Sequence, residues 1–111
     1  KLNKKVDYIL RKYRNITQTK LVVFEKYCLD IQQYCLDKLL VLPIAYSSPS
    51  YEEVLPNIGA NVDKYNKVMK KIFKSQLLNL ELKEYHFSSD QHHLSKLGHE
   101  KISRVLIDNL K

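Results

Sequence analysis

Asp90 and His93 are the residues in this chain whose types and spacing best suit chemistry. They lie three apart in the stretch FSSDQHHLSKLGHEK (87–101), which holds three of the chain's four histidines. A carboxylate this close can accept a hydrogen bond from one imidazole nitrogen, which fixes the tautomer and leaves the other nitrogen as a general base. Such a pair acts on a substrate only when a nucleophile, usually a serine hydroxyl, reaches that free nitrogen. The spacing therefore predicts part of a catalytic site.

Two other interpretations of this stretch remain open. In the first, Asp90 is a loop residue and Ser95 caps the following helix, with the histidines on a polar surface. In the second, Asp90, His93 and either His99 or His86 bind zinc. The spacing of His93 and His99 puts them on different helical faces, and no second cluster completes the ligand set. We therefore predict no metal and no cofactor.

Other candidate nucleophiles have weaker support. Three serines, Ser47, Ser48 and Ser50, follow an apolar segment, but none lies in the Gly-x-Ser-x-Gly turn that presents a nucleophile in α/β hydrolases. Cys28 and Cys35 lie seven apart, which is about 10 Å along a helix and too far for a disulfide. We expect two reduced, half-buried thiols in the core.

Hydrophobic patterning predicts the elements that would position these residues. Apolar residues at helical spacing indicate helices over 2–14, 61–73 with Asn61 as its cap, and 95–110. Apolar runs indicate strands over 38–46 and 78–82, and the segment 20–38 is either a strand followed by a helix or one long helix. This alternation predicts an α/β layer fold with a mainly parallel sheet. The loops SSPS and SSDQHH, which follow the strands, would then share the edge where ligands bind.

Composition and charge limit the class of protein. The 111 residues suit a single domain (1–111) or the C-terminal part of a larger one, and the few glycines and prolines argue against an all-β fold. The net charge is +7, but the lysines are spread along the chain, so we expect a solvated surface and not a nucleic-acid interface. No long apolar run and no signal-peptide pattern are visible, so we expect a soluble protein without a membrane span, in an unknown compartment.

The block Asp-x-x-His-Leu-Ser-x-x-Gly resembles the last conserved block of the SGNH (GDSL-type) esterases and acetyltransferases. Its members here are Asp90, His93, Leu94, Ser95 and Gly98. The preceding segments LLVLPIAYSSPS and VDKYNKVMKKI are similar to the strand and helix that come before this block in the family. The resemblance begins at about residue 38 and runs to the end of the chain.

The resemblance implies a three-layer α/β/α, flavodoxin-like fold in which His93 is the general base and Asp90 orients it. It also implies hydrolysis or transfer of an acyl group, commonly acetyl, from an ester substrate. The family's nucleophile lies in a Gly-Asp-Ser block that does not occur here, so a companion chain or an N-terminal segment would carry it. The alternative is a non-catalytic α/β module that binds a partner protein chain. Whether the chain belongs to an active enzyme is left open.

Overall fold

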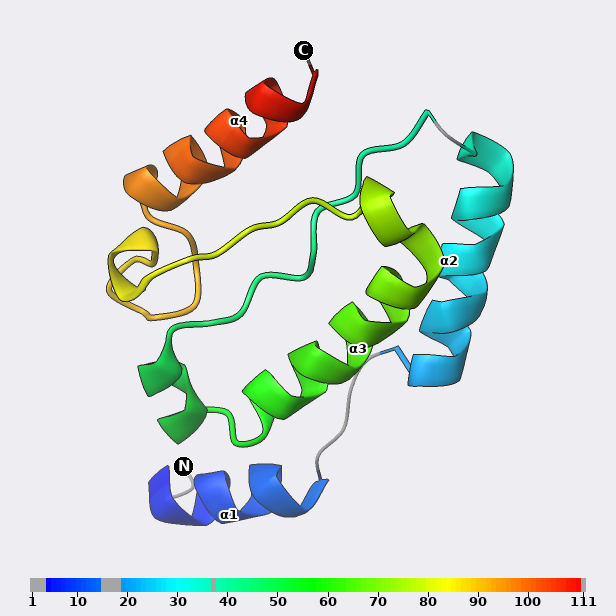
Figure 1. Ribbon diagram of the computed structural model, residues 1–111. Helices are drawn as coiled ribbons and strands as arrows, with labels where there is room; N and C mark the ends of the chain where they lie inside the picture. The colour runs from blue at the N-terminus through cyan, green and yellow to red at the C-terminus, as the bar shows by residue number, and fades with distance from the viewer. Residues whose placement is uncertain (1–3, 15–18, 37, 111) are drawn as a thin grey trace.

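The computed structural model describes residues 4–14, 19–36 and 38–110 (Figure 1). Its elements follow in the order α1 (Lys4–Arg14), α2 (Leu21–Cys35), η1 (Pro49–Glu53), α3 (Ile58–Phe73), η2 (Lys74–Gln76), η3 (Glu84–His86) and α4 (Lys96–Leu110), where η marks a 3-10 turn. The first helix was predicted to end at residue 14, and the break expected after it lies mostly outside the described residues. Within the described ranges, no helix is both long and apolar enough to cross a membrane.

The predicted α/β fold with a mainly parallel sheet is wrong. The structure is 65% helical and 4% strand, and the described residues form no sheet. Two isolated bridges stand in its place, a parallel one between Val41 and Leu77 and an antiparallel one between Phe87 and Leu94. The three-layer α/β/α, flavodoxin-like architecture that the resemblance implied is wrong for the same reason. Residues 38–46 and 78–82, predicted as strands, are extended segments.

These two segments run side by side but pair at one place only (Figure 1). Val41 N donates to Gln76 O at 2.9 Å, and Leu78 N donates to Val41 O at 2.8 Å. Further along, the side-chain amide of Asn66 in α3 binds both backbone groups of Ile44: Ile44 N donates to Asn66 Oδ1 at 2.8 Å, and Asn66 Nδ2 donates to Ile44 O at 2.9 Å. Because a side chain has taken these groups, they are not available to a strand ladder.

The segment left open between a strand and a helix forms the single helix α2. Its β-branched start is exposed, with 72% of Val22 accessible to solvent, because Phe24 and Cys28 at helical spacing supply the inward face. Cys28 is buried, Cys35 is partly exposed, and both are free thiols, which confirms the prediction for the cysteines. Burial, and then the charge of Glu25, raise the pKa of the Cys28 thiol.

The core lies where α2 meets α3 and the extended segments. Met69, Ile72 and Phe73 of α3 are buried together with Cys28, so the predicted apolar stripe of α3 is confirmed. At the edge of this cluster the ring of Phe24 packs edge-on against Tyr65, with centroids 5.0 Å apart.

The start of α3 differs from the prediction. Asn61 lies inside the helix, and α3 begins three residues earlier, at Ile58. The capping group comes from η1 and is the carboxylate of Glu52, which accepts Asn57 N at 2.5 Å and Gly59 N at 3.2 Å. A negative charge at the first turn of a helix also interacts favourably with the helix dipole. This contact fixes η1 against α3.

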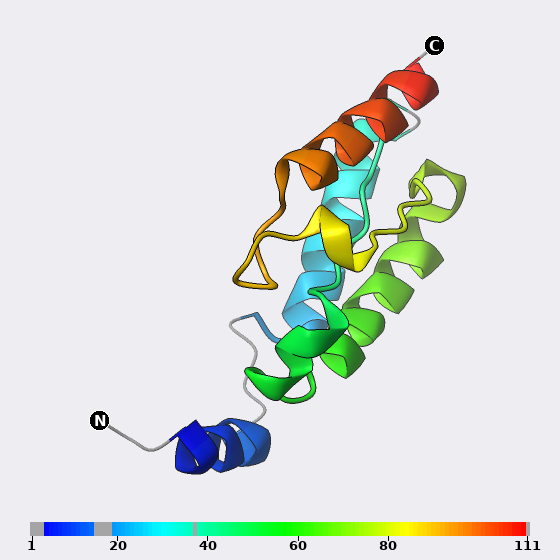
Figure 2. The same ribbon diagram turned by 90° about the vertical axis from the view of Figure 1, so that its left-hand side faces the viewer.

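The described residues form a flat and elongated body. Its principal extents are 49 × 33 × 18 Å and its radius of gyration is 16.0 Å, whereas a compact domain of this length has about 13 Å. Both views place α1 and α4 at opposite ends with α2 and α3 between them (Figure 2). A body this thin leaves apolar side chains uncovered, notably Val22, Tyr34 and Leu36 in and after α2.

Candidate functional site

The predicted catalytic pair lies in a loop between η3 and α4. The bridge between Phe87 and Leu94 closes the loop, and inside it Ser88 N donates to His93 O at 2.8 Å while Gln91 N donates to Ser88 O at 2.9 Å. Gln91 takes a left-handed conformation with a φ of 63°, which turns the chain back on itself. The loop thereby brings its first half against its second half.

Asp90 is the centre of this loop, and both of its carboxylate oxygens have partners. Its Oδ1 accepts the backbone N–H groups of His92 and His93, each at 2.9 Å, and the hydroxyl of Ser88 at 2.8 Å. Its Oδ2 lies 2.5 Å from His93 Nδ1. The hydrogen bond to the His93 ring, followed by the backbone donors and Ser88, holds the pKa of Asp90 well below its usual range. The structure thus brings together the two residues that the spacing singled out.

The arrangement leaves the Nε2 side of the His93 ring, opposite Asp90, accessible to solvent. With Nδ1 donating to Asp90, the proton is fixed on that nitrogen and Nε2 is the basic one. The His93 side chain is 77% exposed and that of Asp90 is 49% exposed. Among the described residues, the serine hydroxyl that bonds a histidine ring is that of Ser47, and its partner is His92 and not His93.

His92 is held from the opposite side by the segment around η1. Its Nδ1 lies 3.0 Å from Ser47 Oγ, and its ring stacks on Tyr51 with centroids 4.7 Å apart and planes at 14°. The His92 and His93 rings meet edge to face, 5.1 Å apart. The two polar loops therefore adjoin, although the edge of a parallel sheet on which they were predicted to meet does not form among the described residues. The sequence offered no signal for the pairing itself, because Ser47 and His92 are 45 residues apart.

Ser48 and Ser50 link the loop after the first extended segment to η3 and to the loop that carries Asp90. Ser48 is almost fully buried (2% exposed), and its Oγ donates to Glu84 Oε1 at 2.5 Å. Ser50 Oγ donates to the same oxygen at 3.1 Å. The hydroxyls of Ser48 and then Ser50 lower the pKa of Glu84. In addition, Ser48 N donates to Gln91 O at 3.1 Å. Glu84 was not predicted as a site residue, and only the tertiary structure shows that it anchors the loop after the first extended segment.

The Leu-Ser-x-x-Gly part of the block docks α4 on η3. Ser95 Oγ accepts Gly98 N at 3.2 Å and donates to Tyr85 O at 2.9 Å, which confirms Ser95 as the helix cap. Ser95 N donates to His86 O at 2.8 Å. A Cβ atom on Gly98 would lie 2.2 Å from His86 O, so only glycine permits this approach. The capping interpretation and the paired Asp90 and His93 therefore coexist in the same block.

The histidines do not gather around a metal site. His86 is buried, and its Nδ1 accepts Lys83 N at 2.6 Å. The residues that the structure describes contain no group of three histidine, cysteine, aspartate or glutamate side chains that could hold a metal ion.

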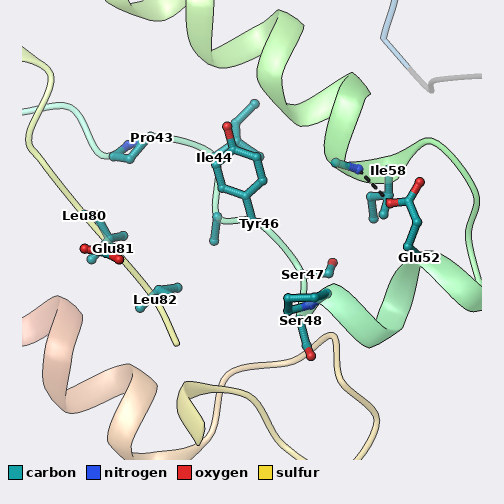
Figure 3. A pocket seen from close by; sticks show the side chains of 13 residues that line it. Pro43, Ile44, Tyr46, Ser47, Ser48, Glu52, Ile58, Leu80, Glu81 and Leu82 are labelled. Atoms are coloured by element: carbon teal, nitrogen blue, oxygen red, sulfur yellow. Dashed lines mark hydrogen bonds between the residues drawn. The ribbon is translucent and has the colours of Figure 1, made fainter. Parts of the chain in front are cut away.

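A pocket of about 390 Å³ lies beside the loops. It is formed by the two extended segments, η1 and the start of α3, and its walls are largely aliphatic (Figure 3). Ser47 and Ser48 line the end nearest the loop that carries Asp90 and His93 (Figure 3). The sequence predicted binding beside these loops, at the edge of a sheet that does not form among the described residues, and gave no signal for a pocket with apolar walls.

Comparisons of the chain with protein-family models, with curated proteins and with solved structures find no match. What the site can do is therefore argued from its own geometry, together with the resemblance of the block that begins at Asp90.

Proposed function

We propose that this chain supplies Asp90 and His93 to a serine-type hydrolase or acyltransferase acting on acyl esters, with the nucleophile on another segment or chain. The observation that carries the proposal is the 2.5 Å contact between Asp90 Oδ2 and His93 Nδ1. The other oxygen of Asp90 is held by three donors, so the carboxylate orientation is fixed. A general base held by an oriented carboxylate is the arrangement that activates a serine hydroxyl.

In the proposed reaction His93 Nε2 takes the proton of the serine hydroxyl as its oxygen attacks the ester carbonyl. Asp90 stabilises the imidazolium that forms, because its negative charge lies beside Nδ1. When the tetrahedral intermediate collapses, Nε2 returns the proton to the departing alcohol and the acyl group stays on the serine. Water, or the hydroxyl of an acceptor molecule, then removes the acyl group by the same steps in reverse.

The exposure of the pair supports a nucleophile that comes from elsewhere. A catalytic imidazole works best where water is excluded, since charges interact more strongly there, yet the His93 side chain is 77% exposed. The exposed apolar residues on α2, with Tyr34 90% accessible, also favour packing against a further segment. A companion segment that covers the loop and brings a serine hydroxyl to Nε2 would complete the site.

The test is hydrolysis of p-nitrophenyl acetate by the complete product of the gene that encodes this chain. His93→Ala is expected to lower kcat/KM by roughly 10²- to 10⁴-fold, the usual contribution of a general base. Asp90→Asn is expected to lower it by a comparable factor, because the amide no longer fixes the tautomer of His93. The matched control is His99→Ala, an exposed histidine on α4, which should leave the rate unchanged. Equal rates for the wild type and His93→Ala would refute the proposal.

A fluorophosphonate probe identifies the nucleophile independently. The probe should label one serine of the complete gene product, and His93→Ala should slow the labelling while His99→Ala should not. Labelling that is indifferent to His93 would show that another base activates the serine.

The alternative function is a non-catalytic helical module that binds a partner protein chain. The exposed apolar side chains of α2 favour it, among them Val22 at 72% and Tyr34 at 90% accessible. The same experiments separate the two functions. A gene product without ester hydrolysis and without a labelled serine, whose complex with a partner chain is lost on Tyr34→Asp, would support the binding module.

A further inference from the structure

We infer that the pocket beside Asp90 and His93 binds the apolar acyl group of a neutral ester, with the ester carbonyl at the end formed by Ser47. The inference rests on the proposed function and adds the class of substrate, which is an ester of an uncharged aliphatic acyl group larger than acetyl. The pocket has a volume of about 390 Å³, within the range of roughly 300 to 1,000 Å³ that is usual for small organic ligands.

The lining favours an aliphatic occupant. Ile44, Ile58, Leu80 and Leu82 contribute side chains from three different segments (Figure 3). Burying an acyl chain against them removes apolar surface of both partners from water, and the gain grows with each methylene group.

The charged groups of the lining favour a neutral ligand. The carboxylate of Glu52 is engaged by backbone N–H groups at the start of α3. Glu81 is paired with Lys83 at 2.9 Å. Both carboxylates are therefore already partnered, and their negative charge opposes a free fatty-acid anion more than an uncharged ester.

The end of the pocket nearest the loop would place a bound ester beside His92, whose ring contacts that of His93. Ser47 lines the pocket and lies 3.0 Å from the ring of His92. The ring of His92 is in turn 5.1 Å from that of His93. An acyl chain that fills the apolar walls thus has its carbonyl end at Ser47, one ring away from the proposed general base.

The test uses binding, which requires no nucleophile. Methyl ketones with six, eight and ten carbons carry the chain and the carbonyl but no leaving group, and they are titrated into the chain while methyl NMR signals of Ile58 and Leu82 are followed. The dissociation constant should fall about fourfold for each added methylene until the pocket is full. Octanoate, which is anionic, should bind more weakly than the ketone of equal length.

A matched pair of variants locates the ligand. A Cβ atom on Gly59, which lines the pocket, meets nothing nearer than Glu52 Oε2 at 3.6 Å, an ordinary contact. The Cβ atom of Gly59→Leu is therefore tolerated at the pocket wall, and a leucine there that takes up pocket volume should weaken ketone binding at least about tenfold, the equivalent of roughly two buried methylenes. Ala60→Leu, at the exposed next position outside the lining, should leave binding unchanged.

The outcomes distinguish this inference from the proposed function. Ketones that shift no pocket methyl, show no dependence on chain length, or bind Gly59→Leu as tightly as the wild type would overturn it. Pocket methyls that respond only to an added companion segment would also overturn it, because the pocket would then seat a protein side chain. Ketone binding that survives His93→Ala supports the inference, whereas hydrolysis indifferent to His93 contradicts the proposed function alone.

Discussion

His92 and His93 are consecutive in sequence, yet two different regions of the molecule hold their rings. The His93 ring is bound within its own loop, by Asp90 three residues away at 2.5 Å. The His92 ring is bound by the segment around η1, through Ser47 at 3.0 Å and stacking on Tyr51. The difference shows that the pair of Asp90 and His93 is a local structure, whereas the surface beside it is made by long-range contacts.

The largest effect on stability is expected at the contact that docks α4 on η3, because the loop carrying both His92 and His93 lies between these two elements. Gly98→Ala would place a Cβ atom 2.2 Å from His86 O, so α4 must move away from η3 and the loop between them loses its anchor. We expect a loss of about 3 kcal/mol in the free energy of unfolding, the upper range for overpacking, measured by urea denaturation. The control is Gly59→Ala, whose Cβ has an ordinary contact at 3.6 Å and which should change stability by less than about 1 kcal/mol. Equal effects of the two substitutions would contradict the close docking of α4.

An intermediate effect is expected on the ionisation of Asp90. Its pKa is depressed in the folded state, so the stability it contributes is present above the usual carboxyl pKa of about 3.9 and is lost as the pH falls toward the native value. His93→Ala should raise the pKa of Asp90 only part of the way, because two backbone N–H groups and Ser88 still bind Oδ1. Carboxyl ¹³C NMR titration of the wild type and of His93→Ala measures the pKa of Asp90 in each.

Ser47→Ala is the control for this titration and sharpens the comparison. Ser47 bonds the ring of His92, so the pKa of Asp90 should not move in this variant. A shift as large as that in His93→Ala would show that the two regions titrate as one unit.

The smallest effect is expected on the stability of the long-range pair. Ser47→Ala removes one hydrogen bond to an exposed ring, and Tyr51→Leu removes one stacked aromatic contact, so each should cost no more than about 1 kcal/mol. Urea denaturation of both variants, with and without His92→Ala, gives the coupling energies. A coupling near zero for both pairs would mean that the η1 segment does not position His92.

The sequence predicted the polar loop better than the apolar segments, and the reason is physical. An apolar run such as residues 38–46 predicts only that its side chains are buried. It does not predict which group forms a hydrogen bond with each backbone N–H and C=O. In the structure Asn66 takes both backbone groups of Ile44, so the run stays extended without a sheet. The β-branched start of α2 left a strand and a helix both open for the same reason, and the helical spacing from Phe24 to Cys28 decided the element.

By itself the sequence determined the features whose partners lie within one turn of each other. The pairing of Asp90 with His93, the cap at Ser95 and the apolar stripe of α3 all depend on spacings of three or four residues, which backbone geometry converts directly into contacts. Only the tertiary structure decided which polar groups meet across the chain. Ser47 meets His92 over 45 residues, Ser48 meets Glu84 over 36, and Ile44 meets Asn66 over 22. Such contacts depend on how the helices and extended segments pack together, and no local pattern encodes that arrangement.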